Sequence, residues 1–480
     1  MKWIVKKSCM RLQIFTCGIA KLLSQSINQK IQTNLTKMSK NQILCVSEWQ
    51  SFGVGEIEEV VASKSEAKAV FAELKAFADE KGNHIFLNSY GKNRLRARNY
   101  VGLIQTKRGF CLEILPKTFR TANENEGFEK HQDKINEAKD ILLNMLKTLK
   151  NSPFKQSHIS NLKTQNAHLL EIFVIMFLNE LETLIKKGLK SDYIECKQNR
   201  KFLKGKLLFT QNLKQNFAHK ERFFTASDEF SSDIAPNKLI KSTLLLLSTR
   251  PFSTKTNARI MQSRFVFDEI SPSQNFDLDF AKCVNLRHFK AYELILLWCK
   301  IFLKKQTFTA YQGSQDAFAL LFDMNKLFES FVAWHLKKRL TNHIVKAQDG
   351  RKFLMQGDKF KIKPDLVIYD KADTKLENPP KIIADVKWKI LSVDEAKNFS
   401  ISQSDLYQIF AYLSKYACRQ GCLIYPKIQT CDYKGGYKFT YKAKLEFGAE
   451  QKECAKSRGE VKKARQKRDI TLRIYFFDLL

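Results

Sequence analysis

The sequence predicts a multi-domain chain of the α/β class, α+β overall, and three observations support this. Its 480 residues are too many for one ordinary domain, and a hydrophobic content of 44% is enough to build several cores. Strand-like segments dominate the N-terminal part and helical periodicity the middle, while the last third alternates the two. We expect a β-rich module over 43–120, a polar linker at 121–133, a mostly helical region over 134–310, and an α/β domain over 320–480 with a mixed central sheet flanked by helices.

The N-terminal module has clear turn and helix signals. A helix is expected over 65–81, where Gly82 ends it. Strands at 99–105 and 110–115 flank a turn that ends at Gly109, which predicts a β-hairpin. Residues 1–42 form an uncertain extension. Met38 is a plausible translation start, so we assign no function to residues 1–37.

The middle region is predicted to be mainly helical. Apolar residues at helical spacing predict a helix over 167–187 that Gly188 terminates. Further helices are expected over 236–248 and 286–303. Before these two helices, residues 193–210 are expected to form a hairpin that turns at residues 204–206.

The last third is predicted to alternate helices and strands. A helix is expected over 323–340, with Glu329 at the edge of its apolar stripe. A second helix is expected over 404–416, with Ser402 and Asp405 as its capping box. The expected strands are 361–369, 381–389, 421–425 and 470–477. Residues 456–468 are a basic run that suits either a solvated surface or a DNA contact.

The charge balance indicates a polyanionic partner. Lys and Arg number 82 against 49 Asp and Glu, a formal net charge of +33. Lysine and arginine bind phosphate backbones by releasing condensed counterions, although charge alone does not identify a ligand. The sequence contains no HExxH and no GxSxG, so a zinc hydrolase or a serine hydrolase is not expected.

The cysteines and the hydropathy indicate a cytoplasmic protein. The 11 cysteines are scattered without a CxxC pair, which is typical of reduced thiols. Cys418, Cys422, Cys431 and Cys454 are the one group that could hold an iron–sulfur cluster, but their spacings match no known pattern. No apolar run reaches the roughly 18 residues needed to span a bilayer, so no membrane association is expected.

Three residues of the last third form a candidate catalytic group. Asp365 opens one predicted strand, and Asp385 lies 20 positions later in the next. Residues i and i+2 of a strand share a face, so Asp385 and Lys387 should project together, and a hairpin would bring Asp365 beside them. Two converging carboxylates repel unless a cation lies between them, and oxygen ligands suit Mg²⁺ better than zinc. Such a group, with a nearby ammonium, is suited to phosphodiester hydrolysis.

Two further residues are candidates for the same site. Glu329 could reach it from the preceding helix, although a boundary glutamate paired with Lys326 is the alternative. Asp405, Gln408 and Tyr412 share one face of the following helix. Gln408 lies in an otherwise apolar stretch, where an amide is costly to bury without a partner. It could bond the catalytic water, the lysine or the DNA backbone, or lie half-exposed.

The order of Glu329, Asp365, Asp385, Lys387 and Gln408 resembles that of the PD-(D/E)XK nucleases. More narrowly, the chain resembles the McrC family, the nuclease subunits of McrBC restriction systems, which act on DNA that carries methylated cytosine. The resemblance extends over about 98–480 and rests on short segments whose order and combination are specific: Val101–Ile104, Leu112–Lys117, Phe202–Lys206, Phe230–Asp233, Pro236–Lys238 and Met324–Glu329.

This resemblance implies an Mg²⁺-dependent endodeoxyribonuclease with a restriction-endonuclease-like domain. It implies that Asp365, Asp385 and Glu329 bind the metal, that Lys387 assists the attack, and that Gln408 supports the site. It also implies double-stranded, methylated DNA as substrate and a McrB-like GTPase ring as partner, with docking through about 43–305. The chain lacks a GxxxxGK[ST] motif, so GTP is expected on the partner and not on this chain.

Two alternative hypotheses remain open. One is a RecB-like repair nuclease or a CRISPR-adaptation nuclease, which would act on DNA ends. The other is a non-catalytic basic DNA-binding scaffold, in which Asp385 and Lys387 form only a structural ion pair.

Overall fold

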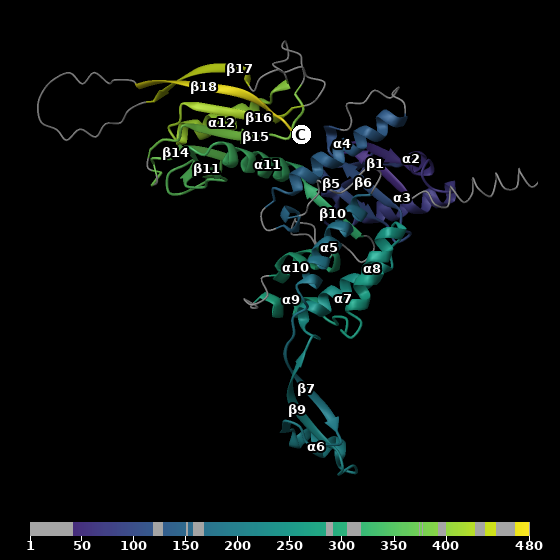
Figure 1. Cartoon of the computed structure of the whole chain (residues 1–480). Coiled ribbons are helices and arrows are strands. Elements are labelled where there is room, and N and C mark those ends of the chain that lie inside the picture. Colours follow the sequence, from purple (N-terminus) through teal and green to yellow (C-terminus); the bar gives the residue numbers. More distant parts are fainter. Residues whose placement is uncertain are drawn as a thin grey trace, which may run out of the picture. The chain divides into compact units, whose positions relative to one another are not determined.

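The computed structural model describes residues 42–118, 128–149, 152–156, 168–284, 291–304, 318–373, 375–376, 378–391, 400–427, 437–447 and 466–479. Several sheets and many helices give a mixed α/β architecture (Figure 1). The residues divide into two compact units, the first formed by 42–98, 103–114 and 318–319 and the second by the remainder. No helix in the ranges given above is long and apolar enough to cross a membrane.

The first unit contains the predicted N-terminal helix and the glycine of the predicted hairpin turn. Helix α3 (Lys64–Asp79) follows the short helix α2 (Val54–Glu58), and its N-cap Ser63 accepts a hydrogen bond from the Glu66 amide. Gly82 and Gly109 both have positive φ, as their predicted roles after the helix and in the hairpin turn require. One three-stranded sheet has the order β2-β4-β3; its strands are β2 (Ser51–Gly53), β3 (Leu87–Ser89) and β4 (Arg94–Ala97).

A second sheet contains the predicted hairpin. Its order is β1-β6-β5-β10, and its strands are β1 (Ile43–Ser47), β5 (Tyr100–Gln105), β6 (Cys111–Leu115) and β10 (Phe318–Asp323). Gly102 of β5 has a φ of +134°, and a Cβ atom there would lie 2.0 Å from the carbonyl oxygen of Leu320. Only glycine allows this close approach of two backbones.

Helices dominate residues 128–304 of the second unit. The helices are α4 (Phe128–Leu146), α5 (Leu169–Lys186), α7 (Ala235–Ser248), α8 (Thr254–Val266), α9 (Phe276–Val284) and α10 (Glu293–Leu303). Their core contains packed aromatic rings, with Phe154 5.4 Å from Phe173 and 5.1 Å from Trp298 between centroids. The expectation of a polar linker over 121–133 is wrong at its C-terminal end, because α4 begins at Phe128.

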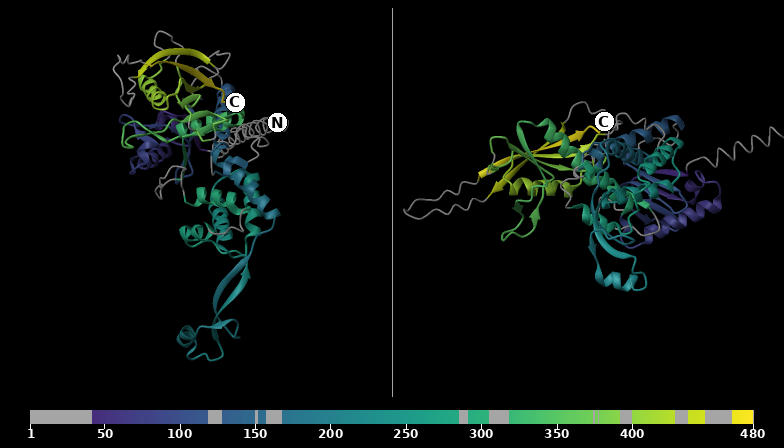
Figure 2. Two further views of the ribbon diagram at one scale, coloured as in Figure 1. Left: turned by 90° about the vertical axis from the view of Figure 1, so that its left-hand side faces the viewer. Right: turned by 60° about the horizontal axis from the view of Figure 1, so that its bottom comes forward.

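The prediction of a hairpin over 193–210 is also wrong in its pairing. Strands β7 (Asp192–Arg200) and β8 (Lys206–Leu207) do not pair with each other; both pair with β9 (Phe223–Ser231), which lies between them. The predicted turn at residues 204–206 is present, and Gly205 has a φ of +76° there. Helix α6 (Phe209–Asn216) lies between β8 and β9 in the chain, at the far end of this three-stranded ladder (Figures 1 and 2).

A six-stranded mixed sheet forms the core of the C-terminal region (Figure 1). Its order is β11-β14-β15-β16-β18-β17, with β15, β16 and β18 parallel and the other neighbours antiparallel. The strands are β11 (His343–Ala347), β14 (Leu366–Asp370), β15 (Ile382–Val386), β16 (Gln420–Pro426), β17 (Tyr437–Phe447) and β18 (Gln466–Phe477). A two-stranded ladder of β12 (Lys352–Phe353) and β13 (Lys361–Ile362) lies between β11 and β14 in the chain.

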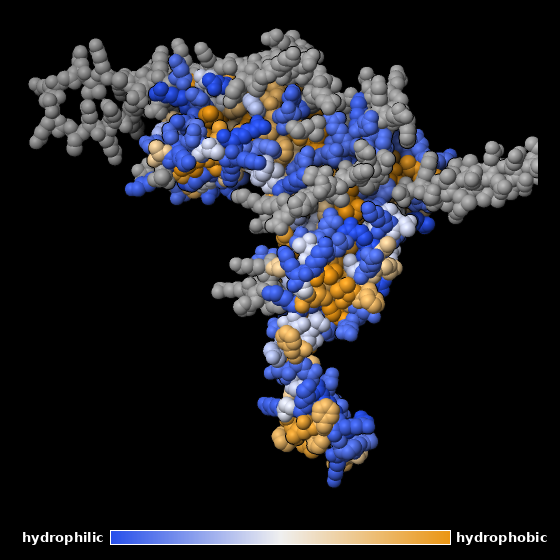
Figure 3. Space-filling model, in the orientation of Figure 1, coloured by the Kyte–Doolittle hydropathy of each residue, from blue (hydrophilic) through white to orange (hydrophobic). Residues whose placement is uncertain are grey.

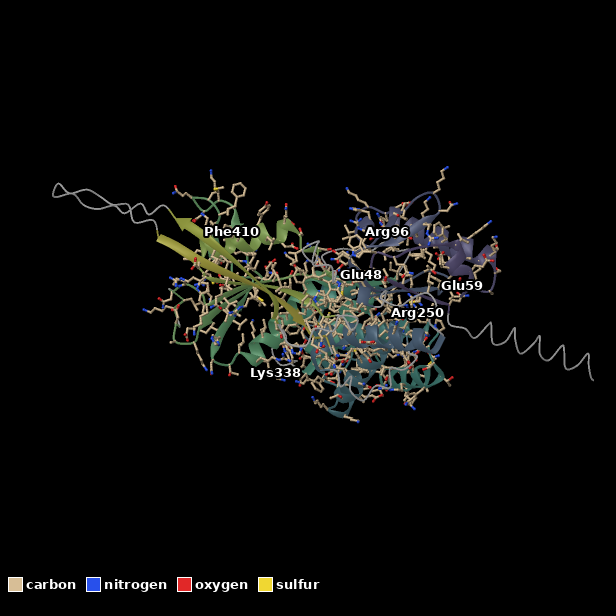
Figure 4. The ribbon with its side chains drawn as sticks, turned by 90° about the horizontal axis from the view of Figure 1, so that it is seen from above. Glu48, Glu59, Arg96, Arg250, Lys338 and Phe410 are labelled. Carbon is tan, nitrogen blue, oxygen red and sulfur yellow. The ribbon has the colours of Figure 1, made fainter. Side chains whose placement is uncertain are left out.

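Helices α11 (Met324–Arg339) and α12 (Gln403–Lys415) pack against this sheet. Ile409 and Leu413 of α12 enter a core with Ile383 and Leu423, whereas Phe410, labelled in Figure 4, is 40% exposed. The predicted capping box is wrong, because the Ser402 side chain makes no cap hydrogen bond and Asp405 pairs with Lys389 instead.

Some predictions fall on residues that the structure does not describe. They concern residues 1–37, positions 456–465 of the basic run, Cys431 and Cys454. Cys418 and Cys422 are buried free thiols.

Candidate active site

Pairing of β14 with β15 places the two predicted aspartates together. Leu366 pairs with Ala384, so Asp365, just before β14, lies beside Asp385 in β15. The Val386 amide donates a 2.8 Å hydrogen bond to Asp365 Oδ2. This antiparallel register is the hairpin that the sequence predicted.

Lys387 follows β15 and shares the side of Asp385. Its amide donates to the carbonyl of Ile424 at 2.8 Å, which extends the strand alignment by one residue. Its Nζ lies 2.8 Å from Asp385 Oδ2 and donates a 2.8 Å hydrogen bond to Gln408 Oε1. The prediction that Asp385 and Lys387 project together is therefore confirmed. Of the partners proposed for Gln408, its side-chain amide contacts the lysine.

Tyr412 of helix α12 contacts the other end of the Gln408 side-chain amide. Gln408 Nε2 donates to the Tyr412 hydroxyl at 2.8 Å, one helical turn later. The buried Asp405 lies on the same face, 2.7 Å from Lys389 Nζ and 4.0 Å from Lys387 Nζ. The predicted polar face of this helix thus points to the lysine, and Tyr412 orients the amide that positions it.

Gln348 joins the site, although no pattern in the sequence singles it out. It follows β11 in the left-handed conformation, with a φ of 54°. Its backbone amide donates to the Asp365 carbonyl at 2.9 Å. Its side-chain amide donates to Asp365 Oδ1 at 3.0 Å and to Glu329 Oε2 at 3.2 Å. Gln348 thereby links α11 to the β14–β15 hairpin and places Glu329 at the site.

Burial and mutual repulsion raise the pKa of the three carboxyl groups. Asp385 is 1% exposed, and burial, then the charge of Asp365, raises its pKa to about 7. Burial, then Asp323 and Asp385, raises the pKa of Glu329 to about 7. Burial and the charge of Glu329 raise that of Asp365 as well. Burial opposes the charge of Lys387, but Asp385 and Asp365 raise its pKa, so it stays an ammonium.

The donor set fits a hard divalent cation. Asp385 Oδ2 is buried and accepts no aligned hydrogen bond, although Lys387 Nζ lies at ion-pair distance. Across the described ranges, no three His, Cys, Asp or Glu side chains form a preassembled metal cage. Mg²⁺ needs no such cage, because it uses one or two carboxylates and keeps several waters. Asp365 and Asp385, with Glu329 close by, are the residues that would hold it.

Comparisons with known proteins agree with this architecture. A chain in the structure of Thermococcus gammatolerans McrB AAA+ hexamers with bound McrC superposes with a TM-score of 0.59 at 18% identity, over 91% of this chain and 94% of that one. A chain of the Thermococcus gammatolerans McrBC complex gives 0.42 at 20% identity, over 62% and 88%. No curated protein matches the sequence. The model of the McrBC 5-methylcytosine restriction system component family matches residues 95–426, more than half of the chain. This chain belongs to that family.

Proposed function

We propose that this chain is the Mg²⁺-dependent endodeoxyribonuclease subunit of a modification-dependent restriction system of the 5-methylcytosine type. In this proposal residues 320–480 form a PD-(D/E)XK, restriction-endonuclease-like domain that hydrolyses phosphodiester bonds in double-stranded, methylated DNA in the cytoplasm. The observation that carries it is the convergence of Asp365, Asp385 and Lys387, with the buried Oδ2 of Asp385 lacking an aligned donor. A purely structural ion pair would not require a second carboxylate at the same point.

Each residue of the candidate site has its own role in the proposed hydrolysis. A bound Mg²⁺ would polarise a phosphate oxygen and lower the pKa of a coordinated water. Lys387, aimed by Gln408, can donate to a phosphate oxygen as negative charge develops there. The water oxygen forms a bond to phosphorus while the bond to the leaving sugar oxygen breaks. Glu329, held at the site by Gln348, can accept the proton of the water.

The proposed partner is a McrB-like GTPase ring that this chain stimulates. The similar structure from Thermococcus gammatolerans contains McrC bound to McrB AAA+ hexamers. Residues 134–310 include a candidate docking surface on the ladder of β7, β9, β8 and α6. Figure 3 shows hydrophobic side chains gathered over its far end. They include exposed Phe202 (61%), Phe209 (71%), Leu213 (66%) and Phe217 (83%). Contiguous exposed apolar surface of this kind is typical of protein-binding sites.

Cleavage of cytosine-methylated plasmid tests the proposal. The purified chain is combined with Mg²⁺, GTP and the GTPase encoded beside it, and each component and the methylation are omitted in turn. We expect cutting only in the complete mixture with methylated DNA. Cutting without the partner or on unmethylated DNA would support a repair nuclease instead. If DNA is bound but not cut with Mg²⁺ or Mn²⁺, a non-catalytic scaffold replaces the proposal.

A further inference from the structure

Residues 349–364 form a basic hairpin next to the candidate active site. Strands β12 and β13 pair antiparallel, with Lys352 opposite Ile362 and Phe353 opposite Lys361. Its four exposed lysines are Lys352, Lys359, Lys361 and Lys363. Within the part of the chain that the structure describes, no carboxylate lies within ion-pair distance of any of them, so their positive charge is not neutralised locally.

Phe360 makes the outer part of this hairpin unusual. Its side chain is 72% exposed, and Met355 in the same hairpin is 57% exposed. Phe360 also has a φ of 58°, a conformation that costs a non-glycine residue roughly 1–2 kcal/mol. The hydrogen bonds from the Leu354 amide to the Phe360 carbonyl and from the Met355 amide to the Lys359 carbonyl hold this geometry. An exposed ring kept in a strained conformation indicates a binding role more than a folding role.

The base of the basic hairpin is fixed to the catalytic residues. It begins after Gln348, which bonds Asp365 and Glu329, and it ends at Pro364, directly before Asp365. Asp349 is 6% exposed and accepts hydrogen bonds from Arg351 and from the Tyr369 hydroxyl. A ligand held by this hairpin is therefore held beside the candidate metal site by the chain itself.

We propose that the basic hairpin binds the DNA backbone next to the bond that is cut, an inference that rests on the proposed nuclease function. Lys359, Lys361 and Lys363 are all exposed within five residues of this short hairpin, and in this proposal they contact phosphates. The Phe360 ring packs on the sugar and base edge. Solvated lysines are the simpler reading, but they do not account for the strained, exposed ring or for the attachment of both ends to the catalytic residues.

DNA binding by the full chain tests this role without requiring cleavage. Fluorescence anisotropy with a short labelled duplex in EDTA gives the Kd and its dependence on salt concentration. For Lys359→Ala/Lys361→Ala we expect a roughly tenfold higher Kd and a salt slope smaller by about 1.8, since each lost phosphate contact removes about 0.9. Lys68→Ala/Lys75→Ala, on the exposed side of α3, removes the same charge and should behave as wild type.

Two further variants distinguish the effect of lysine charge on DNA binding from the effects of protein stability and of the Phe360 ring. Lys359→Arg/Lys361→Arg keeps the charge and should retain the wild-type slope. Phe360→Ser should weaken binding with the slope unchanged, because no phosphate contact is lost. All variants change exposed side chains, so wild-type thermal unfolding is expected and is checked alongside.

The outcomes distinguish this inference from the proposed function. If the plasmid is cut but the Lys359/Lys361 variant binds DNA as wild type does, the hairpin role is overturned and the nuclease remains. Loss of GTPase binding with DNA binding intact would instead make the hairpin a protein-docking surface. If no cleavage is ever seen but the salt slope falls as expected, the hairpin is a DNA-binding element and the catalytic proposal fails.

Discussion

At the residue scale, the candidate site places three carboxyl groups close together with limited access to solvent. Asp385 is buried and Asp365 and Glu329 are half-buried, and this desolvation and their mutual repulsion raise the pKa of all three. Lys387 offsets only part of this repulsion. Without a cation, the three carboxyl groups destabilise one another when all are ionised. A divalent metal binds this fully ionised state.

This arrangement predicts a pH-dependent stability that Mg²⁺ removes. A carboxyl group whose pKa rises from about 4 to about 7 on folding binds more protons in the folded chain between these values. The free energy of unfolding should therefore fall as pH rises through this window. In EDTA we expect the Tm of the wild type to fall by a few degrees more than that of Asp385→Asn between about pH 5 and pH 8.

Differential scanning fluorimetry with and without Mg²⁺ checks this prediction. Mg²⁺ should raise the Tm of the wild type at the higher pH and leave that of Asp385→Asn nearly unchanged. Equal pH profiles for the two proteins, or equal Mg²⁺ effects, would show that the carboxyl groups are not coupled in this way.

The sequence predicted most of the candidate site but not Gln348. Asp365, Asp385 and Lys387 lie in or beside strands whose alternation indicates their direction, and Gln408 lies on a helical face with a fixed period. Gln348 has neither signal. Its role depends on the pairing of β11 with β14 and on a left-handed backbone, and both are tertiary features.

At the element scale, local signals located turns and helices better than strand partners. The predicted turn at Gly205 is present, yet β7 pairs with β9 across more than 20 intervening residues. A turn signal determines where the chain reverses but not which strand it then meets. Ser402 is the N-cap residue of α12, but the predicted capping box does not form. Its side chain makes no cap hydrogen bond, and Asp405 pairs with Lys389, a contact that spacing within the helix cannot reveal.

The basic hairpin is expected to depend on Asp349 for its position. Asp349 accepts from Arg351 and Tyr369, and its carbonyl accepts from the Tyr416 hydroxyl of the α12 C-cap. Burial acts to raise the pKa of Asp349, but the hydrogen bonds and charge of Arg351 hold it below its ordinary value. Asp349→Asn should therefore destabilise the protein by about 1–3 kcal/mol, since bonds to a charged group are weakened.

Denaturant unfolding measures this cost against a matched substitution. Asp358→Asn changes an exposed aspartate at the tip of the same hairpin, and asparagine tolerates its positive φ. Its effect should lie within about 0.5 kcal/mol of zero. If the two variants are equally stable, Asp349 does not anchor the hairpin.

At the scale of the whole molecule, chemistry and partner binding are assigned to different regions. The catalytic candidates all belong to the six-stranded sheet, its two helices and the adjoining Gln348, whereas the exposed apolar side chains concentrate on the ladder near α6. The alternation of strands and helices in the last third predicted the class of the sheet. Its order could not be predicted, because β18 inserts between β16 and β17 only through long-range pairing.

In the proposed function, Asp385 belongs to a DNA-cleaving metal site. Its most direct test is the single-turnover rate of methylated-DNA cleavage by Asp385→Asn in the complete mixture with partner, GTP and Mg²⁺. The control is Asp469→Asn, which changes an exposed aspartate on β18 of the same sheet. We expect at least about a 100-fold lower rate for Asp385→Asn with DNA binding retained, and a wild-type rate for the control. Equal cleavage by the two variants would contradict the assignment of the active site.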